Sequence, residues 1–519
     1  MIALFRCINK MRVSLKILLF VLLTISYNLT YADVYQVKNY GAKADGITLD
    51  TDAINLTIEA AAKAGGGTVN FSAGTYLSYS IRLKSNITLY LEQGATILAA
   101  EPKGDIGYDA PEIGATNNFQ DFGHSHWHNS LIWGENLENI SILGPGVIYG
   151  KGLTRGGPFQ APFGNKAIAL KLCKNVILKD FTILYGGHFG ILATGVDNMT
   201  IDNIKMDTNR DGMDIDACRN VRISNCSINS PWDDAICLKS SYALGYARAT
   251  ENVTITNCQV SGFDRGTFIN GTYKRDEYNL VPDKEGPTGR IKFGTESNGG
   301  FKNITVSNCV FEFCRGLALE TVDGGLLEDI SISNITMRDI VNSPIFLRLG
   351  GRMRGPEGVP IGELRRVNIS NLMVYNADSH FSSIISGLPG NDIEDIKLSN
   401  IRIFYKPIDS AESKIQKEVP EYEKAYPEPE KFGVMPSYGF YIRHAKNVEM
   451  NNVEVSFLGK ETRPAIILTD VKNIQFNNVK AQKAGKSPVL VLKEVINFET
   501  NGGNMLKSMK LSLVTDKSF

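Results

Sequence analysis

The feature that most constrains this chain is a short unit in which apolar and polar residues alternate between two polar ends. Clear copies span Asn198 to Asn203, Asn220 to Asn225 and Asn252 to Asn257, and others begin at Asn303, Asp329, Arg366, Asp395, Asn447 and Asn473. An alternation with a period of two is typical of a strand with one buried face. The closing Asn suits a corner, because Asn tolerates the left-handed backbone conformation better than most residues.

The spacing of these units predicts how the strands are arranged. Successive copies begin roughly 22 to 50 residues apart, mostly near the lower value, which is the range of solenoid repeats. A coil of about 22 residues with several short strands fits an all-β, right-handed parallel β-helix, in which coils pair with one another and stack their Asn residues. A β-sandwich with coincidental asparagines is the alternative fold.

The N-terminal region differs from the repeats. Residues 51–64 are predicted to form a helix that ends before Gly65-Gly66-Gly67 and caps the open end of the solenoid. Residues 1–32 have a basic start, an apolar run from Ile17 to Ile25 and small residues near Ala32, which is typical of a signal peptide. An uncleaved membrane anchor is the alternative, although the apolar run is short for a bilayer span.

These observations give the domain organisation. Residues 33–519 are predicted to form a single β-helix catalytic domain, with residues 33–100 as its N-terminal cap and first coils and residues 404–446 as a long loop insertion. A second long stretch lies between Asn257 and Asn303. We expect a monomer that is exported to the periplasm or the extracellular space and is not attached to a membrane after signal cleavage.

Charge and cysteine content exclude some partners. The chain has 55 Lys and Arg against 55 Asp and Glu, so no global field attracts nucleic acid.

Of its eight cysteines, Cys7 would leave with the signal peptide. Cys226, Cys258 and Cys309 follow an Asn at the same place in the repeat, and stacked side chains with parallel Cβ vectors do not favour a disulfide. We expect buried free thiols there.

One region concentrates carboxylates. Asp211 lies in the run from Asn209 to Asp216, and Asp233 and Asp234 follow Trp232 about one coil later. A β-helix would stack Asp211 on this pair. Because carboxylates held close together raise at least one pKa, the cluster can supply both an acid and a base, as glycoside hydrolysis requires. A calcium site or a solvated acidic corner is the alternative.

Several motifs resemble the polygalacturonases of glycoside hydrolase family 28. The resemblance rests on Val37 to Gly46, Gly65 to Val69, Ala73 to Tyr76 and Leu83 to Leu89, and it continues through the repeats. The family's Asn-Thr-Asp motif is matched by Asn209-Arg210-Asp211, and its Gly-Asp-Asp motif by Trp232-Asp233-Asp234. The resemblance implies that Asp233 is the general acid, that Asp211 and Asp234 activate water, and that the anomeric configuration is inverted.

Two family motifs are altered. Thr288-Gly289-Arg290 stands nearest to the family's Gly-His-Gly, so that histidine is absent. The coil that should carry Arg-Ile-Lys reads Ala318-Leu319-Glu320, whereas Arg290-Ile291-Lys292 lies one coil early. The chain therefore resembles the family in its hydrolytic residues and departs from it in the residues that contact the sugar.

Other residues are candidates for contacting a uronate. Besides Asn209, Arg290, Lys292 and Glu320, they are three arginines of a Gly-rich loop, Arg348, Arg352 and Arg354, whose guanidinium groups match a carboxylate in a bidentate way. His188 lies on the coil before Asp211 and could replace the missing histidine, although a packing role is favoured. His124, His126 and His128 alternate as metal ligands would, but no carboxylate stands at ligand spacing in the sequence. We expect neither a metal nor a cofactor.

The sequence as a whole predicts an inverting hydrolase that acts from the chain end on a pectic poly- or oligosaccharide of the galacturonan or rhamnogalacturonan type. A β-helix polysaccharide lyase and a non-catalytic glycan-binding β-helix are the alternatives.

Overall fold

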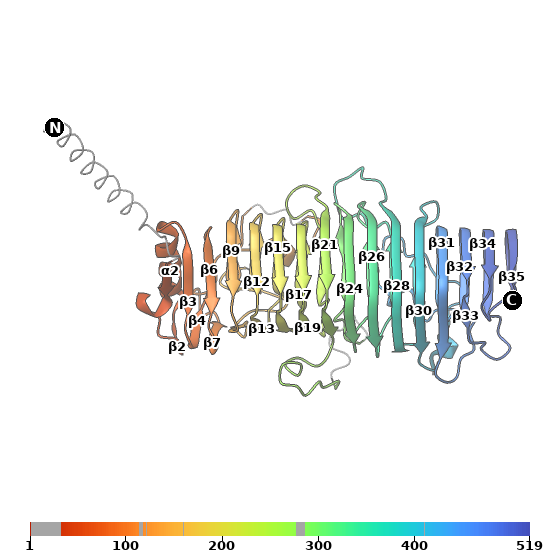
Figure 1. The fold of residues 1–519 in the computed structure, drawn as a ribbon, viewed down its shortest axis with the longest axis horizontal. Coiled ribbons are helices and arrows are strands. Elements are labelled where there is room, and N and C mark those ends of the chain that lie inside the picture. Colours follow the sequence, from red (N-terminus) through yellow and green to blue (C-terminus); the bar gives the residue numbers. More distant parts are fainter. Residues whose placement is uncertain (2–32, 114–117, 121, 159, 277–285, 409) are drawn as a thin grey trace.

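The computed structural model describes Met1 and residues 33–113, 118–120, 122–158, 160–276, 286–408 and 410–519. The predicted signal peptide, its cleavage point and Cys7 lie outside these residues. The described chain forms the predicted right-handed parallel β-helix, an elongated stack of coils (Figure 1). Strands of successive coils pair in parallel, as at Asp197 and Arg219. The one α-helix among the described residues is α2 (Thr51–Lys63).

The strands form three faces. The first face contains β1 (Val34–Gln36), β3 (Gly67–Phe71), β6 (Ile87–Leu91), β9 (Glu138–Leu143), β12 (Lys174–Lys179), β15 (Asp197–Asp202), β18 (Arg219–Ser224) and β21 (Thr250–Thr256). The second contains β2 (Asp45–Leu49), β4 (Gly74–Ser78), β7 (Ala95–Ala99), β10 (Val147–Tyr149), β13 (Thr182–Leu184), β16 (Lys205–Asp207), β19 (Ser227–Asn229), β22 (Gln259–Ser261) and β33 (Lys480–Ala481).

The third face carries the candidate site. It contains β5 (Ile81–Arg82), β8 (Ile132–Glu135), β11 (Lys166–Lys171), β14 (Phe189–Thr194), β17 (Asp211–Asp216), β20 (Ile236–Ser240), β23 (Ile291–Ser297), β25 (Leu317–Thr321), β27 (Ile345–Leu349) and β29 (Ser383–Ser386). Long strands run through more than one face from the middle of the chain onwards: β24 (Phe301–Glu312), β26 (Leu326–Arg338), β28 (Glu363–Ala377), β30 (Ile393–Tyr405), β31 (Phe440–Phe457), β32 (Ile466–Asn477) and β34 (Leu490–Asn501). The last strand, β35 (Met509–Ser518), is antiparallel to β34.

The asparagines of the repeat form the corners. Asn198, Asn220 and Asn252 all have φ of 57°, and so does the left-handed residue Asn334 in a later unit. The side-chain amide of Asn220 donates to Asn198 at 3.2 Å, and that of Asn252 donates to Asn220 at 3.1 Å. The predicted asparagine ladder is therefore confirmed, and it lies on the solvent side.

Both ends of the solenoid are covered. Helix α2 buries Ile54, Ile58 and Ala61 against the first coils and ends one residue earlier than predicted. The carboxylate of Asp50 accepts from the backbone N–H groups of Lys43 and Ala44 and fixes the approach to this helix. The N-terminal cap is confirmed. At the other end, β35 covers the last coil edge by antiparallel pairing.

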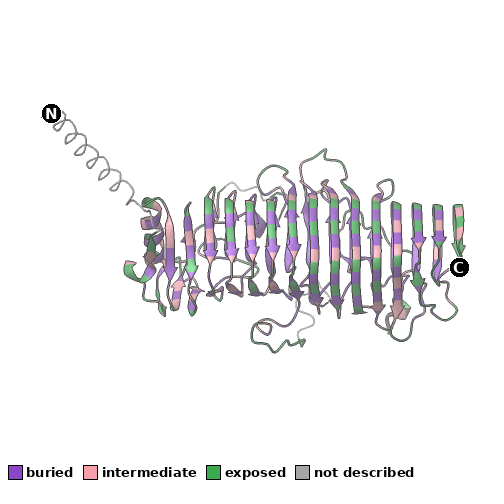
Figure 2. Ribbon diagram, viewed as in Figure 1, coloured by how far each residue is buried: buried purple, intermediate pink, exposed green. Residues whose placement is uncertain are grey.

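The faces differ in burial (Figure 2). Strands of the first face alternate between buried and exposed residues, whereas β17, β25 and β27 are buried at every position. The reason is that chain segments cover the outer side of the third face. Residues 406–439, which contain η3 (Ser410–Lys414) and η4 (Pro429–Phe432), place Phe432 and Met435 on Ala318 and Phe346 there.

The inner core carries a column of thiols. Cys226, Cys258 and Cys309 are buried and not disulfide-bonded. They follow Asn225, Asn257 and Asn308 at equivalent corners. Among the described residues, no helix combines the length and the apolar character needed to cross a membrane.

Candidate active site

Three aspartates come together on the third face. Asp211 is the first residue of β17, and Asp233 and Asp234 precede β20 on the next coil. The backbone N–H of Gly212 donates to Asp234 O at 2.9 Å, so the two segments are stacked in register. Carboxylate oxygens of all three residues lie within 4.8 Å of one another. The structure thus brings together the three residues that the sequence spacing singled out.

The three carboxyl groups have different surroundings. Asp211 and Asp234 are almost fully buried, whereas the side chain of Asp233 is 14% exposed. Burial, and then the charge of Asp233, raise the pKa of Asp211 to about 7. Because two carboxylates this close repel each other when both are ionised, the pair of Asp211 and Asp233 shares a proton over the acidic and neutral range.

An arginine stands over this pair. Nε of Arg210 lies 3.3 Å from the carboxylate of Asp233, and its Nη1 lies 3.8 Å from that of Asp211. Arg210 also contacts the ring of His188. Nδ1 of His188 donates to the carbonyl oxygen of Arg155 at 2.7 Å, because a carbonyl can only accept. Burial, and then the charge of Arg210, lower the pKa of His188 well below its ordinary value. His188 therefore acts as a neutral support for Arg210.

Asp234 faces a different group of cations. Nε of Arg290 donates to its carboxylate at 2.8 Å, and Nζ of Lys292 lies 3.5 Å away. Ile291 pairs with Ile236, so these residues lie one coil beyond the aspartate pair. Lys292 pairs in turn with Ala318, which places Ala318-Leu319-Glu320 a further coil along. This is the offset that the sequence indicated.

The same cations are neutralised by the insertion. Glu428, which is 7% exposed, receives hydrogen bonds from Arg290 at 2.7 Å and from Arg315 at 2.7 Å. Arg315 also pairs with Glu430. Nζ of Lys292 donates to the hydroxyl of Tyr426 at 3.2 Å. We call Arg290, Lys292 and Arg315 the closed cation cluster, because carboxylates of the chain itself occupy it.

Glu320 borders this cluster. It is fully buried, with its carboxylate 3.6 Å from Nζ of Lys292 and 3.3 Å from the hydroxyl of Thr295. Burial raises its pKa to about 7. Its partners are residues of the chain, and it supports Lys292.

Several known proteins are similar to this chain. The family described as "Rhamnogalacturonase A/epimerase, pectate lyase-like" matches residues 34–264. A "Probable polygalacturonase" of Vitis vinifera is 25% identical over 395 residues, which cover 70% of this chain and 73% of that protein. An "Exo-poly-alpha-D-galacturonosidase" of Dickeya chrysanthemi is 31% identical over 170 residues, 32% of this chain and 28% of the relative. The solved structure of a family 28 exopolygalacturonase from Yersinia enterocolitica is similar to this chain, with a TM-score of 0.64 and 18% sequence identity. The match covers 86% of this chain and 79% of that protein's chain.

The chain is similar to these polygalacturonases and diverges from each of them. The family match includes Asp211, Asp233 and Asp234. It ends before Arg290, Glu320 and the insertion that carries Glu428. The altered Gly-His-Gly and Arg-Ile-Lys motifs therefore lie beyond this match, whereas the changed neighbours Arg210 and Trp232 lie inside it.

Where the family 28 motif has a histidine between two glycines, this chain has Thr288-Gly289-Arg290, which adds a charged side chain. The backbone N–H of Gly289 donates to Asp233 O at 2.9 Å, so Thr288-Gly289-Arg290 lies directly beside the aspartates. Gly289 has φ of 51°. Its position would bring a Cβ to 2.2 Å from the carbonyl oxygen of Ser261, so a side chain does not fit. Arg290 follows immediately and reaches Asp234.

The arginines of the Gly-rich loop are occupied by contacts within the chain. Arg348 donates to Ser386 at 2.7 Å and to Glu421 O at 2.7 Å, and so anchors the insertion. Arg352 pairs with Asp323, whose carboxylate also accepts from the backbone N–H of Arg354 at 2.9 Å. The structure therefore gives Arg348 and Arg352 partners within the chain and does not bring them to the three aspartates.

The alternating histidines separate in space. Nε2 of His124 lies 3.0 Å from Nζ of Lys239 and 3.8 Å from Asp214, in a buried cluster that includes Glu296. Nε2 of His128 instead lies 2.9 Å from Glu135 and 3.6 Å from Glu112. The fold thus supplies His128 with carboxylates that the sequence did not indicate. Lys171 is 2.9 Å from Glu135 and forms part of an ion-pair network there.

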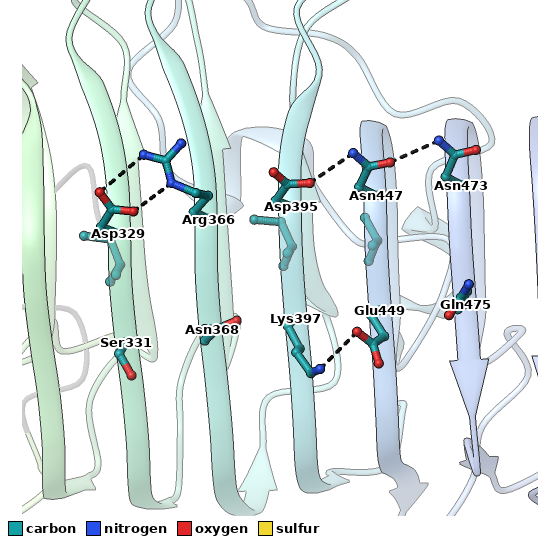
Figure 3. A pocket seen from close by; sticks show the side chains of 13 residues that line it. Asp329, Ser331, Arg366, Asn368, Asp395, Lys397, Asn447, Glu449, Asn473 and Gln475 are labelled. Carbon is teal, nitrogen blue, oxygen red and sulfur yellow. Dashed lines mark hydrogen bonds and ion pairs between the residues drawn. The ribbon is translucent and has the colours of Figure 1, made fainter.

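A shallow groove of about 640 Å³ lies on the first face, over later coils (Figure 3). Its charged residues pair with each other: Arg366 with Asp329 at 2.7 Å, and Lys397 with Glu449 at 3.1 Å. The rest of its lining is largely the asparagine ladder, including Asn447 and Asn473, which are joined at 3.0 Å. The groove contains none of the three aspartates, and its remaining carboxylate, Asp395, accepts from the side-chain amide of Asn447 at 3.0 Å.

Sequence reasoning missed two parts of the site. Glu428 and Tyr426 lie in a segment rich in Pro, Glu and Lys, whose composition predicts only a loop. Arg155 and Arg265 lie over the ring of Trp232, at 3.5 and 4.0 Å from its centroid, beside Asp233. No motif marks these two arginines, and only the stacking of coils brings them together.

Proposed function

We propose that this chain hydrolyses glycosidic bonds in a pectic poly- or oligosaccharide. The observation that carries the proposal is the convergence of Asp211, Asp233 and Asp234 within 4.8 Å, where burial and then the charge of Asp233 raise the pKa of Asp211 to about 7. The names of the relatives, polygalacturonase and exo-poly-alpha-D-galacturonosidase, support the substrate class. The carboxylates also have the spacing of a cation site, but Arg210, Arg290 and Lys292 already surround them, and these charges disfavour a metal ion.

The roles follow from exposure and partners. Asp233 is the most exposed of the three, so it is placed to protonate the leaving oxygen. Asp234 is held by Arg290 at 2.8 Å and Lys292 at 3.5 Å, and with Asp211 it orients and deprotonates the attacking water. Arg210 stabilises the negative charge that Asp233 acquires when its proton leaves.

Inversion of configuration is part of the proposal and rests on the family 28 resemblance. Carboxyl groups of inverting pairs usually stand about 6.5–9.5 Å apart and those of retaining pairs about 5–5.5 Å. Here one oxygen of each carboxylate lies within 4.8 Å of the others, which is closer than the usual inverting separation. Proton NMR of the first product decides the matter, since a retained anomer would contradict inversion.

The test of hydrolysis is Asp233→Asn. A neutral amide cannot donate the proton, so we expect turnover on galacturonan or rhamnogalacturonan fragments to fall roughly 10²- to 10⁴-fold with the fold intact. Asp105→Asn, at an exposed aspartate, is the matched control and should keep full turnover. Near-normal turnover of Asp233→Asn would contradict the assignment. An unsaturated product that absorbs in the ultraviolet would point to a lyase instead.

We further propose that the enzyme acts from the chain end. Residues 406–439 cover the third face just beyond the aspartates, where Phe432 packs on Phe346 and Glu428 reaches Arg290. A covered face beyond the catalytic coil leaves less room for a polymer to continue in that direction. Viscosity and reducing ends, followed together, test this proposal. A rapid loss of viscosity with few new ends would show internal cleavage and contradict it.

Export and a monomeric state complete the proposal. A pectic substrate is met outside the cytoplasm, which agrees with the signal peptide expected in residues 1–32. The mass of the mature protein should correspond to a chain that starts near Asp33, and light scattering should give one chain per particle. A full-length mass or a stable dimer would contradict the respective point.

A further inference from the structure

We propose that Arg155, Arg210 and Arg265, grouped around Trp232, form a subsite that binds the carboxylate of a uronate sugar next to the three aspartates. We call these three residues the open cation cluster. The inference rests on the proposed function, because it names the substrate group that the same site holds. It assigns this role to residues outside the closed cation cluster.

The cluster is compact and borders the acid. The guanidinium carbon of Arg155 lies 3.5 Å from the centroid of the Trp232 ring, and that of Arg265 lies 4.0 Å from it. Trp232 precedes Asp233, whose carboxylate is 3.3 Å from Nε of Arg210. A sugar carboxylate held by these arginines would therefore belong to a residue at the cleavage point or directly beside it.

The arginines are held by buried contacts. The fully buried Asp207 of β16 accepts from the backbone N–H of Gly266 at 3.0 Å and from that of Phe268 at 3.0 Å, which fixes the loop around Arg265. The carbonyl of Arg155 accepts from His188, and the same histidine contacts Arg210. These supports resemble a prepared site, because the backbone at Arg155 and around Arg265 and the side chain of Arg210 are positioned before a ligand arrives.

The charges of the open cluster are not balanced. In the part of the chain that the structure describes, neither Arg155 nor Arg265 forms an ion pair, and burial followed by the charges of Arg210 and Arg265 lowers the pKa of Arg155. Asp233 and Asp211 are the carboxylates that face the cluster, and they share a proton. In the closed cluster, by contrast, Asp234, Glu428 and Glu430 balance three cations.

Unused hydrogen-bonding groups lie in the same place. Nε of Arg265, Nε1 of Trp232 and Oδ1 of Asn209 are each buried without a hydrogen-bond partner among the described residues. Two of these atoms are donors, which suits an anionic oxygen, and the third accepts, which suits a sugar hydroxyl. A uronate offers both groups on one ring, and guanidinium groups bind its carboxylate in a bidentate way.

The experiment compares binding of an acid with binding of its ester. In an Asp233→Asn background, which slows turnover, calorimetry measures the dissociation constants of trigalacturonate and of its methyl ester. We expect the parent to prefer the acid at least tenfold. Arg265→Gln and Arg155→Gln should each weaken binding of the acid about tenfold and change binding of the ester less than twofold. Arg222→Gln, an exposed arginine on the first face, is the matched control and should change neither constant.

Other variants keep the test decisive. Arg265→Lys retains the positive charge but loses the bidentate guanidinium group. It should weaken binding of the acid by an intermediate factor and leave the melting curve normal. An unchanged preference for the acid in both Gln variants, or no preference in the parent, overturns the subsite even if the enzyme hydrolyses pectin. An arginine-dependent preference in a protein that cleaves nothing leaves the subsite standing and contradicts the proposed hydrolysis.

Discussion

Two groups of basic residues flank the same three aspartates, and they differ in what surrounds them. In the closed cation cluster, Arg290 and Arg315 share the carboxylate of Glu428 and are almost completely buried. In the open cation cluster, Arg155 and Arg265 lie over an indole ring and form no ion pair among the described residues. Carboxylates of the chain itself therefore pair with the closed cation cluster, whereas none pairs with Arg155 or Arg265 among the described residues.

The difference shows that the identity of a basic residue does not define its role. Arg290 and Lys292 are the residue types expected of a uronate site. Their charges are nevertheless paired with Asp234 and, for Arg290, with Glu428 of the insertion. An added carboxylate would have to displace Glu428 and leave it without its partners. Three variants, Glu428→Ala, Asp211→Asn and Arg265→Gln, test this contrast.

Glu428→Ala should break the closed cluster. It leaves Arg290 and Arg315 buried without their shared carboxylate, and removing one partner of a buried ion pair costs about 3–5 kcal/mol. The free energy of unfolding, measured in guanidinium chloride, should fall by that amount. Glu418→Ala, at an exposed glutamate of the same insertion, should have almost no effect. Equal stability of the two variants would mean that the cluster is not balanced by Glu428.

Asp211→Asn should remove a pH dependence from the aspartates between the clusters. The folded pKa of about 7 lies above the ordinary 3.8, so the native state keeps a proton that the unfolded chain releases. This group therefore favours folding below about pH 4 and loses that contribution as the pH rises to about 7.

Relative to the wild type, Asp211→Asn should gain stability between pH 4 and pH 8, on the order of 1–3 kcal/mol. Because Asp211 and Asp233 titrate together, the midpoint of the gain belongs to the pair. Unfolding titrations at several pH values measure it, with Asp105→Asn as the control. A difference that does not vary with pH would contradict the shared proton.

Arg265→Gln should have the smallest effect on stability. The variant loses a cation–π contact of about 0.5–1 kcal/mol but also relieves repulsion from Arg155. We expect the free energy of unfolding to stay within about 0.5 kcal/mol of the wild-type value. A loss as large as that of Glu428→Ala would reveal an anion bound to Arg265 and remove the contrast between the clusters.

The sequence predicted the periodic features of the molecule well. The asparagine corners, the parallel pairing and the stacking of Asp211 on Asp234 all follow from a repeat of fixed length, because equivalent positions of neighbouring coils must lie side by side. The terminal helix followed from its capping signals. The sequence also indicated that Arg290 and Lys292 lie one coil before Ala318, because this offset is a whole repeat.

Contacts that leave the repeat were not predictable. Glu428 reaches Arg290 across 138 positions through a loop without a period, and neither end carries a pattern that points to the other. The carboxylates beside His128 and the pairing of Arg265 with Trp232 are of the same kind. They depend on how loops fold back on the solenoid.

The insertion also has a consequence for the order in which the molecule matures during synthesis. Contacts between coils such as that of Asn198 with Asn220 join residues 22 positions apart, so coils can assemble one after another as the chain emerges. The link from Arg290 to Glu428 forms only after several more coils have been made. A nascent chain therefore has its aspartates stacked while Arg290 and Arg315 still lack Glu428, and the catalytic region is completed late, by a segment that belongs to a distant part of the solenoid.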